Sequence, residues 1–121
     1  MKESNVLKTK SYVFALEIVR QSKTIKEIHK EYDLARQLLR SGTAIGALIR
    51  EAEFGQSRAD FISKLSIALK EANETDYKLS LLKGSNLLSE KIFNHLLKQC
   101  EELIKMLVSS IKTAKSKINQ K

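Results

Sequence analysis

The stretch QLLRSGTAIGALIREAEF, residues 37–54, decides the fold because it places Gly42 and Gly46 one helical turn apart inside a run with helical periodicity. A glycine inside a helix costs about 1 kcal/mol relative to alanine, because it frees the unfolded backbone and packs no side chain. The pair therefore needs compensation, and the close approach of another helix is its expected source. The other two glycines, Gly55 and Gly84, fall between periodic segments, where helices are expected to end.

The composition of the whole chain predicts one all-α domain, residues 1–121. The chain has no proline, and 42% of its residues are hydrophobic and 30% charged, with few β-branched runs. No segment reaches the ~18 uncharged apolar residues that a membrane span requires, and the first residues lack the apolar core of a signal peptide. Cys100 is the only cysteine, which excludes an intrachain disulfide. We therefore expect a cytoplasmic protein with no membrane contact.

Four long amphipathic segments predict helices over about 7–30, 33–54, 57–83 and 89–118. Short connections between helices of similar length favour an antiparallel, up-down-up-down four-helix bundle. Ser57 with Asp60 resembles a capping box, and Ser89 is suited to cap the last helix. The core is predicted from apolar residues spaced four and three apart. These are Leu7, Phe14, Ile18, Ile25 and Ile28 in the first segment; Phe61, Leu65, Ala68, Ala72, Thr75, Leu79 and Leu82 in the third; and Phe93, Leu97, Cys100, Ile104, Leu107, Ile111, Ala114 and Ile118 in the fourth.

Two side chains of the second segment are predicted to meet acidic residues of the third. If these helices turn at residues 55 and 56, Arg40 lies level with Glu71, and Gln37 lies level with Glu74. We expect an ion pair or hydrogen-bond network between Arg40 and Glu71 or Glu74. Its expected role is structural, since such a pair mainly sets the register of two helices.

The first segment also has an apolar arc wider than one helix contact needs. The run SYVFALEIV, residues 11–19, contains a single charged residue. We expect Tyr12, Ala15 and Val19 to cover a second neighbour.

The formal net charge of +8 and the pI near 9.6 favour an acidic partner, of which nucleic acid is the commonest. Residues 8–30 carry six basic residues against two glutamates, and residues 91–121 carry seven lysines against two glutamates. Because the first and last helices are neighbours in an up-down bundle, their charge is predicted to combine into one basic flank.

Lysines recur every seven residues along the last segment, which lines them along one outward stripe at about 10.5 Å spacing. Such a row suits contacts with a phosphate backbone that do not read sequence. The alternative is an ordinary solvated helix face, and no aromatic residue interleaves the lysines in sequence, which argues against stacking of single-stranded bases. The candidate contacts are Lys91, Lys98, Lys105, Lys112, Lys115 and Lys117, with Arg20, Lys23 and Lys30 as neighbours, and the tail adds Lys121.

Enzyme chemistry is not indicated. Neither His29 nor His95 has an acidic residue three positions before it, as a di-metal carboxylate bundle requires. Cys100 lies on the predicted apolar seam, where burial makes a thiol inert. No glycine-rich phosphate loop, Ser/His/Asp arrangement or zinc spacing is present in the sequence. We expect no metal, cofactor or small-molecule substrate.

Three segments carry a family resemblance: SYVFALEIV, QLLRSGTAIGALIREA (37–52) and KEANETDYKLSLL (70–82). Together they resemble the small four-helix-bundle proteins encoded in intervening sequences of bacterial 23S ribosomal RNA genes. The residues that fit the two family motifs include Gln37, Arg40, Ser41, Gly42, Gly46, Glu71 and Glu74.

The resemblance implies an assembly as well as a fold. The family is similar in architecture to accessory proteins of diversity-generating retroelements, which form basic pentameric barrels and bind nucleic acid and a reverse transcriptase. A homo-pentamer that binds RNA or DNA is therefore expected for this chain. The rival hypothesis is a protein interaction scaffold whose positive charge meets an acidic partner or maintains solubility.

Overall fold

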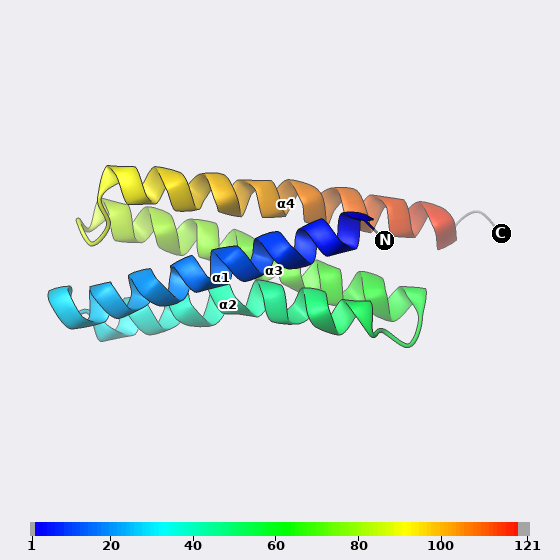
Figure 1. The fold of residues 1–121 in the computed structure, drawn as a ribbon, viewed down its shortest axis with the longest axis horizontal. Helices are drawn as coiled ribbons and strands as arrows, with labels where there is room; N and C mark the ends of the chain where they lie inside the picture. Colours follow the sequence, from blue (N-terminus) through cyan, green and yellow to red (C-terminus); the bar gives the residue numbers. More distant parts are fainter. Residues whose placement is uncertain (1, 119–121) are drawn as a thin grey trace.

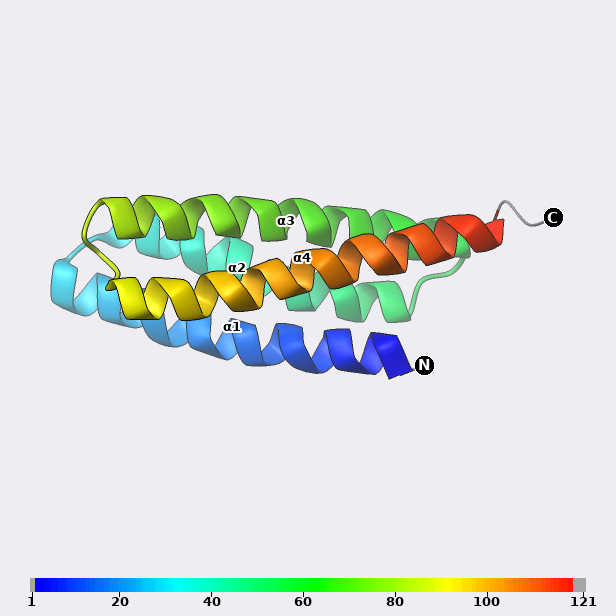
Figure 2. The same ribbon diagram turned by 90° about the horizontal axis from the view of Figure 1, so that it is seen from above.

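Four α-helices follow one another in the computed structural model, which describes residues 2–118, with side chains from residue 5 onward. They are α1 (Lys2–His29), α2 (Tyr32–Glu53), α3 (Arg58–Gly84) and α4 (Glu90–Ile118). Consecutive helices pack side by side, and α1 closes the bundle against α4 with a smaller contact. Figures 1 and 2 show the start of α1 and the end of α4 at the same end of the bundle as the α2–α3 turn. The predicted all-α, up-down-up-down four-helix bundle is confirmed.

The helix boundaries follow local capping chemistry. The Ser57 hydroxyl accepts a hydrogen bond from the Asp60 amide at 3.0 Å, as predicted, but the Asp60 carboxylate reaches the Gln56 amide and not that of Ser57. Ser89 caps α4 through the Ile92 amide at 3.2 Å. α1 begins earlier than the predicted residue 7, since no glycine or proline interrupts the preceding turn.

The two tight turns at the far end of the bundle use non-glycine residues with positive φ. Lys30 (φ 57°) ends α1, and the Glu31 side chain then caps α2 through the Leu34 amide at 3.1 Å. Asn86 (φ 62°) ends α3 in a Schellman motif, in which the Leu87 amide donates to the Leu82 carbonyl at 2.8 Å. Gly84 is the last residue of α3, so this helix ends where the sequence predicted, and the residue with positive φ that follows is Asn86.

The core matches most of the predicted seams. All the predicted positions of α3 are buried except Phe61, which is half-buried. Ile28 is 71% exposed and not in the core, because α1 is ending there. On α4 Cys100 and Leu107 are fully buried as predicted, but Leu96 and Leu103 are fully buried in place of Leu97 and Ile104, which are half-buried. Ile118, at the end of α4, is 38% exposed and not in the core.

α1 packs closely against α2 at Gly42 and Gly46. A Cβ on Gly42 would lie 2.8 Å from Cγ2 and 2.9 Å from Cγ1 of Ile18, and a Cβ on Gly46 would lie 3.4 Å from the Ser11 hydroxyl. The predicted close approach of another helix is confirmed, and the helix is α1 of the same chain. The glycines therefore give no support to contacts between subunits.

The predicted link between α2 and α3 is present. The Arg40 guanidinium lies 3.6 Å from the Glu71 carboxylate and 3.4 Å from the Glu74 carboxylate. Beneath it, the Ser41 and Thr75 hydroxyls form a buried hydrogen bond of 2.9 Å. Gln37, predicted to lie level with Glu74, is exposed and makes no side-chain hydrogen bond among residues 5–118. The family-motif residues Arg40, Ser41, Glu71 and Glu74 therefore contribute to the packing of α2 against α3.

Candidate nucleic-acid interface

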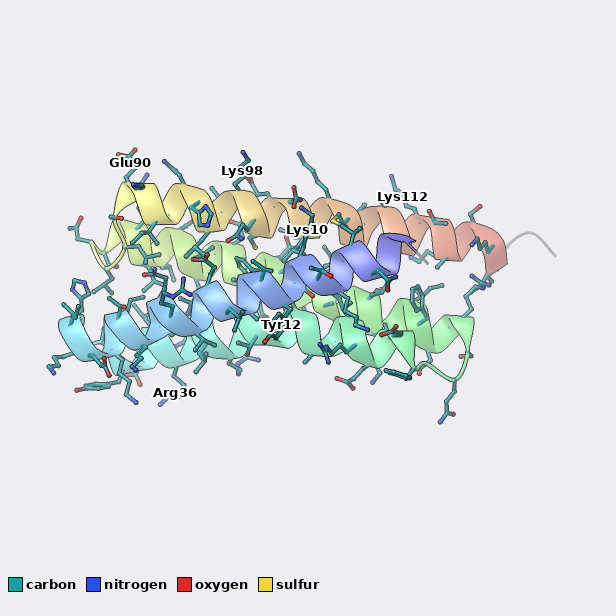
Figure 3. All side chains as sticks on the ribbon, viewed as in Figure 1. Lys10, Tyr12, Arg36, Glu90, Lys98 and Lys112 are labelled. Atoms are coloured by element: carbon teal, nitrogen blue, oxygen red, sulfur yellow. The ribbon has the colours of Figure 1, made fainter. Side chains whose placement is uncertain are left out.

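The outer face of α4 carries a row of four exposed lysines, Lys91, Lys98, Lys105 and Lys112, which we name the α4 row. The described ion pairs that involve lysine use Lys8, Lys10 and Lys64, so the α4 row has no carboxylate partner within residues 5–118. Figure 3 shows Lys98 and Lys112 pointing away from the bundle in the same direction. Seven residues of helix rise about 10.5 Å, so the row extends over about 31 Å.

Lys115 and Lys117 are also exposed on the last turns of α4. Residues two apart on a helix point about 160° apart, so these two lysines flank the α4 row on different sides and do not extend it as a line. Lys121 lies outside the described residues.

Carboxylates occupy the seam between α1 and α4. Lys10 binds Glu102 at 2.6 Å, and His95 Nε2 lies 3.6 Å from Glu17. The hydrogen bond from Lys10, with the charges of Lys10 and Lys98, lowers the pKa of the Glu102 carboxyl. The two helices are neighbours as predicted, but these pairs place negative charge between their basic residues. The predicted single basic flank is therefore divided.

The three predicted neighbours on α1 lie at separate places. Arg20 is exposed, and its guanidinium is 3.8 Å from Glu17 at the α1–α4 seam. Lys30 lies at the turn after α1. Lys23 lines a groove between α1 and α2, on a different side of α1 from its contact with α4. Only Arg20 therefore lies beside the helix that carries the α4 row.

The groove that includes Lys23 was missed by sequence reasoning. We name it the α1–α2 groove, and it has a volume of about 520 Å³. Its lining brings Lys26 from α1 beside Tyr32 and Arg36 from α2. The groove thus places an aromatic ring beside lysines of α1, whereas the prediction that no aromatic interleaves the lysines concerned those of α4. The register of two antiparallel helices would have revealed the groove, had the α1–α2 turn been marked by glycine or proline.

The groups considered for enzyme chemistry are dispersed. Burial, followed by the negative charges of Asp76 and Glu101, raises the pKa of the Cys100 thiol to about 12. This thiol donates a hydrogen bond to the Ala72 carbonyl at 3.3 Å, which confirms that it is buried on the seam. Within the part of the chain described, no cluster of three His, Cys, Asp or Glu residues could hold a metal ion.

None of the helices has both the length and the apolar character needed to cross a membrane, within residues 2–118.

Family models and solved structures both give matches. The family described as 23S rRNA-intervening sequence protein matches residues 3–109. A crystal structure of a protein of unknown function from the S23 ribosomal protein family of Bacteroides thetaiotaomicron is 49% identical, with a TM-score of 0.89. The alignment covers 91% of this chain and 98% of that one. A search of curated proteins finds no match.

Proposed function

The chain belongs to the 23S rRNA-intervening sequence protein family, and from this premise we propose that it is a non-enzymatic, cytoplasmic bundle that binds structured RNA or other nucleic acid. The observation that supports the proposal is the α4 row, four exposed lysines without carboxylate partners in residues 5–118. Flexible ammonium groups at regular spacing match a phosphate backbone without reading its bases.

Binding through the α4 row has a defined salt dependence. Each neutralised phosphate of a duplex contributes about −0.9 to the slope of log K against log salt concentration, because counterions are released. Four contacts therefore give a slope of about −3 to −4 for an RNA hairpin. Sequence preference among hairpins of equal length is expected to be small.

The test replaces all four lysines of the α4 row with glutamine. Hairpin affinity should fall, and the salt slope should approach zero. A matched variant, Arg50→Gln with Arg58→Gln, Lys70→Gln and Lys78→Gln, removes the same charge from α2 and α3. If both variants lose affinity equally, net charge and not the α4 row is responsible. If the α4 variant binds as the wild type does, the site assignment is wrong.

Self-association is the second part of the proposal. Exposed apolar residues follow one side of α1, namely Tyr12 at 54%, Leu16 at 47% and Val19 at 47%. An arc of this kind on one helix is typical of a face that another subunit covers. We infer a homo-oligomer, and the resemblance to pentameric barrels favours five copies of the 13.7 kDa chain. Light scattering coupled to size exclusion measures the mass directly, and a Leu16→Glu variant should dissociate. A monomeric wild type would refute the assembly.

The rival function is a scaffold for an acidic protein partner. The purified protein discriminates the two, because bound nucleic acid raises the absorbance at the nucleic-acid maximum and is released by salt. A protein that carries no nucleic acid, binds no hairpin and captures an acidic protein would favour the scaffold.

A further inference from the structure

The α1–α2 groove combines apolar walls with positive charge. Val19 of α1 and Leu39 of α2 line it together with the Tyr32 ring, which is 53% exposed. Lys23, Lys26 and Arg36 line it from both helices. Its volume of about 520 Å³ lies within the range typical of sites for small ligands. The groove therefore suits a flat apolar group joined to an anion.

A buried hydroxyl lines the same groove. Ser22 is 4% exposed, and its hydroxyl has no hydrogen-bond partner among residues 5–118. A buried polar group without a partner is unfavourable. The Ser22 hydroxyl oxygen is covered by the surrounding residues, so the groups that the groove offers to a ligand are its exposed cations and the Tyr32 ring.

The charge balance of the groove is positive. Glu27 is the one carboxylate in the lining, against three cations. Asp33 lies 3.1 Å from Arg36, but this pair is three-quarters exposed and therefore weak, so Arg36 stays available to a stronger anion.

The charge also discriminates among possible occupants. An acidic amphipathic peptide would match the charge, but it would leave the small volume of the groove unexplained. A nucleotide has an aromatic base for the Tyr32 ring and a phosphate for the cations.

We propose that the α1–α2 groove binds an unpaired nucleotide of single-stranded nucleic acid, with its base against Tyr32 and its phosphates against Lys23, Lys26 and Arg36. The inference rests on the proposed nucleic-acid binding but uses a different face of the molecule. Figure 3 shows Arg36 at the opposite side of the bundle from Lys98 and Lys112. A single strand and a hairpin are thus bound by different surfaces.

The test uses a short single-stranded RNA that contains the fluorescent base 2-aminopurine. Stacking on Tyr32 should quench the fluorescence, and Tyr32→Leu should weaken binding by about 5- to 150-fold, the range of a stacked base, whereas Tyr32→Phe should bind as the wild type does. Lys23→Gln with Lys26→Gln should reduce the salt slope by about 1.4. The matched pair Lys70→Gln with Lys78→Gln should not change quenching.

Ser22→Ala is a control beside the groove. Because the hydroxyl is covered and has no partner in the described chain, its removal should leave stability unchanged or raised and strand affinity unchanged. Equal affinity of Tyr32→Leu and wild type would overturn the proposal. So would displacement of the RNA by an acidic peptide with no quenching, or loss of self-association in the Tyr32→Leu variant with no effect on RNA.

The outcomes for the two surfaces are separable. If the glutamine variant of the α4 row still shows quenching while losing the hairpin, both assignments stand. If the hairpin does not bind the wild type but the strand is quenched, the α4 proposal fails and the groove stands. A free nucleoside monophosphate that binds as tightly as the strand would refute the single strand as the ligand.

Discussion

Replacing Gly42 with alanine should destabilise the bundle, although alanine is the better helix former. The new Cβ would lie 2.8 and 2.9 Å from the two γ carbons of Ile18, which is fully buried and branched next to its backbone. Overpacking a core costs about 1–3 kcal/mol, and two such contacts place this substitution in the upper part of that range. The propensity gain of about 1 kcal/mol offsets part of it. The net loss should be about 1–2 kcal/mol.

Gly46 supplies the matched control on the same helix. An alanine there would meet Ser11 at 3.4 to 3.6 Å, which is ordinary van der Waals contact. Gly46→Ala should therefore stabilise the protein by up to about 1 kcal/mol. The two substitutions should differ by about 2–3 kcal/mol, although they place the same residue one turn apart.

The assay is urea unfolding followed by far-ultraviolet circular dichroism, at several protein concentrations because self-association would change the apparent stability. A double-mutant cycle with Ile18 identifies the cause. Ile18→Val keeps both γ carbons, so Gly42→Ala should still destabilise. Ile18→Ala removes them and keeps only the Ile18 Cβ, at 3.2 Å, so Gly42→Ala should then cost less than in the wild type. An osmolyte present in every sample keeps the Ile18→Ala variant folded.

Two results would refute this reasoning. One is a Gly42→Ala protein more stable than the wild type. The other is an unchanged effect of Gly42→Ala in the Ile18→Ala background, because the cost would then come from somewhere other than contact with α1.

Three further predictions concern the core and the α2–α3 link. Thr75→Val should cost about 1–3 kcal/mol in urea unfolding, because it removes the buried partner of the Ser41 hydroxyl, and adding Ser41→Ala should recover part of the loss. Arg40→Gln should cost less than about 1 kcal/mol, and the cost should vanish in high salt, because the Arg40 side chain is 63% exposed. The buried Cys100 thiol, with its pKa raised to about 12, should react with Ellman's reagent only after unfolding. The folded chain keeps the Cys100 thiol proton, whereas the unfolded chain releases it above the ordinary pKa of 9.0. The contribution of Cys100 to the free energy of unfolding is therefore complete below about pH 9 and declines toward pH 12. Cys100→Ala should lack that decline.

Local patterns were sufficient to predict the helices and most of the core. The spacing of apolar residues on α3 predicted its buried face, and Ser57 and Ser89 marked two helix starts. The turn after α1 was poorly marked because Lys30 adopts a left-handed conformation that glycine more often supplies. The α4 seam was offset because Leu96 and Leu97 are both leucine, and only packing decides which one faces the core.

The candidate site likewise has parts that the sequence predicted and parts that it did not. Periodicity alone indicated an exposed lysine row on α4, since a seven-residue repeat returns to nearly the same face of a helix. The position of the turn between α2 and α3 also predicted that Arg40 pairs with Glu71 or Glu74. The sequence by itself therefore determined what lies along one helix or between two helices joined by a visible turn.

Only the tertiary structure decided how charge is distributed between helices. It placed Glu17 and Glu102 in the α1–α4 seam, and it brought Tyr32 of α2 beside Lys23 and Lys26 of α1. The physical reason is that successive residues of a helix point about 100° apart. A small rotation of a helix about its axis therefore changes which side chains face a neighbouring helix. The net charge follows from the sequence alone, whereas the charge of each surface depends on how the helices are rotated about their axes.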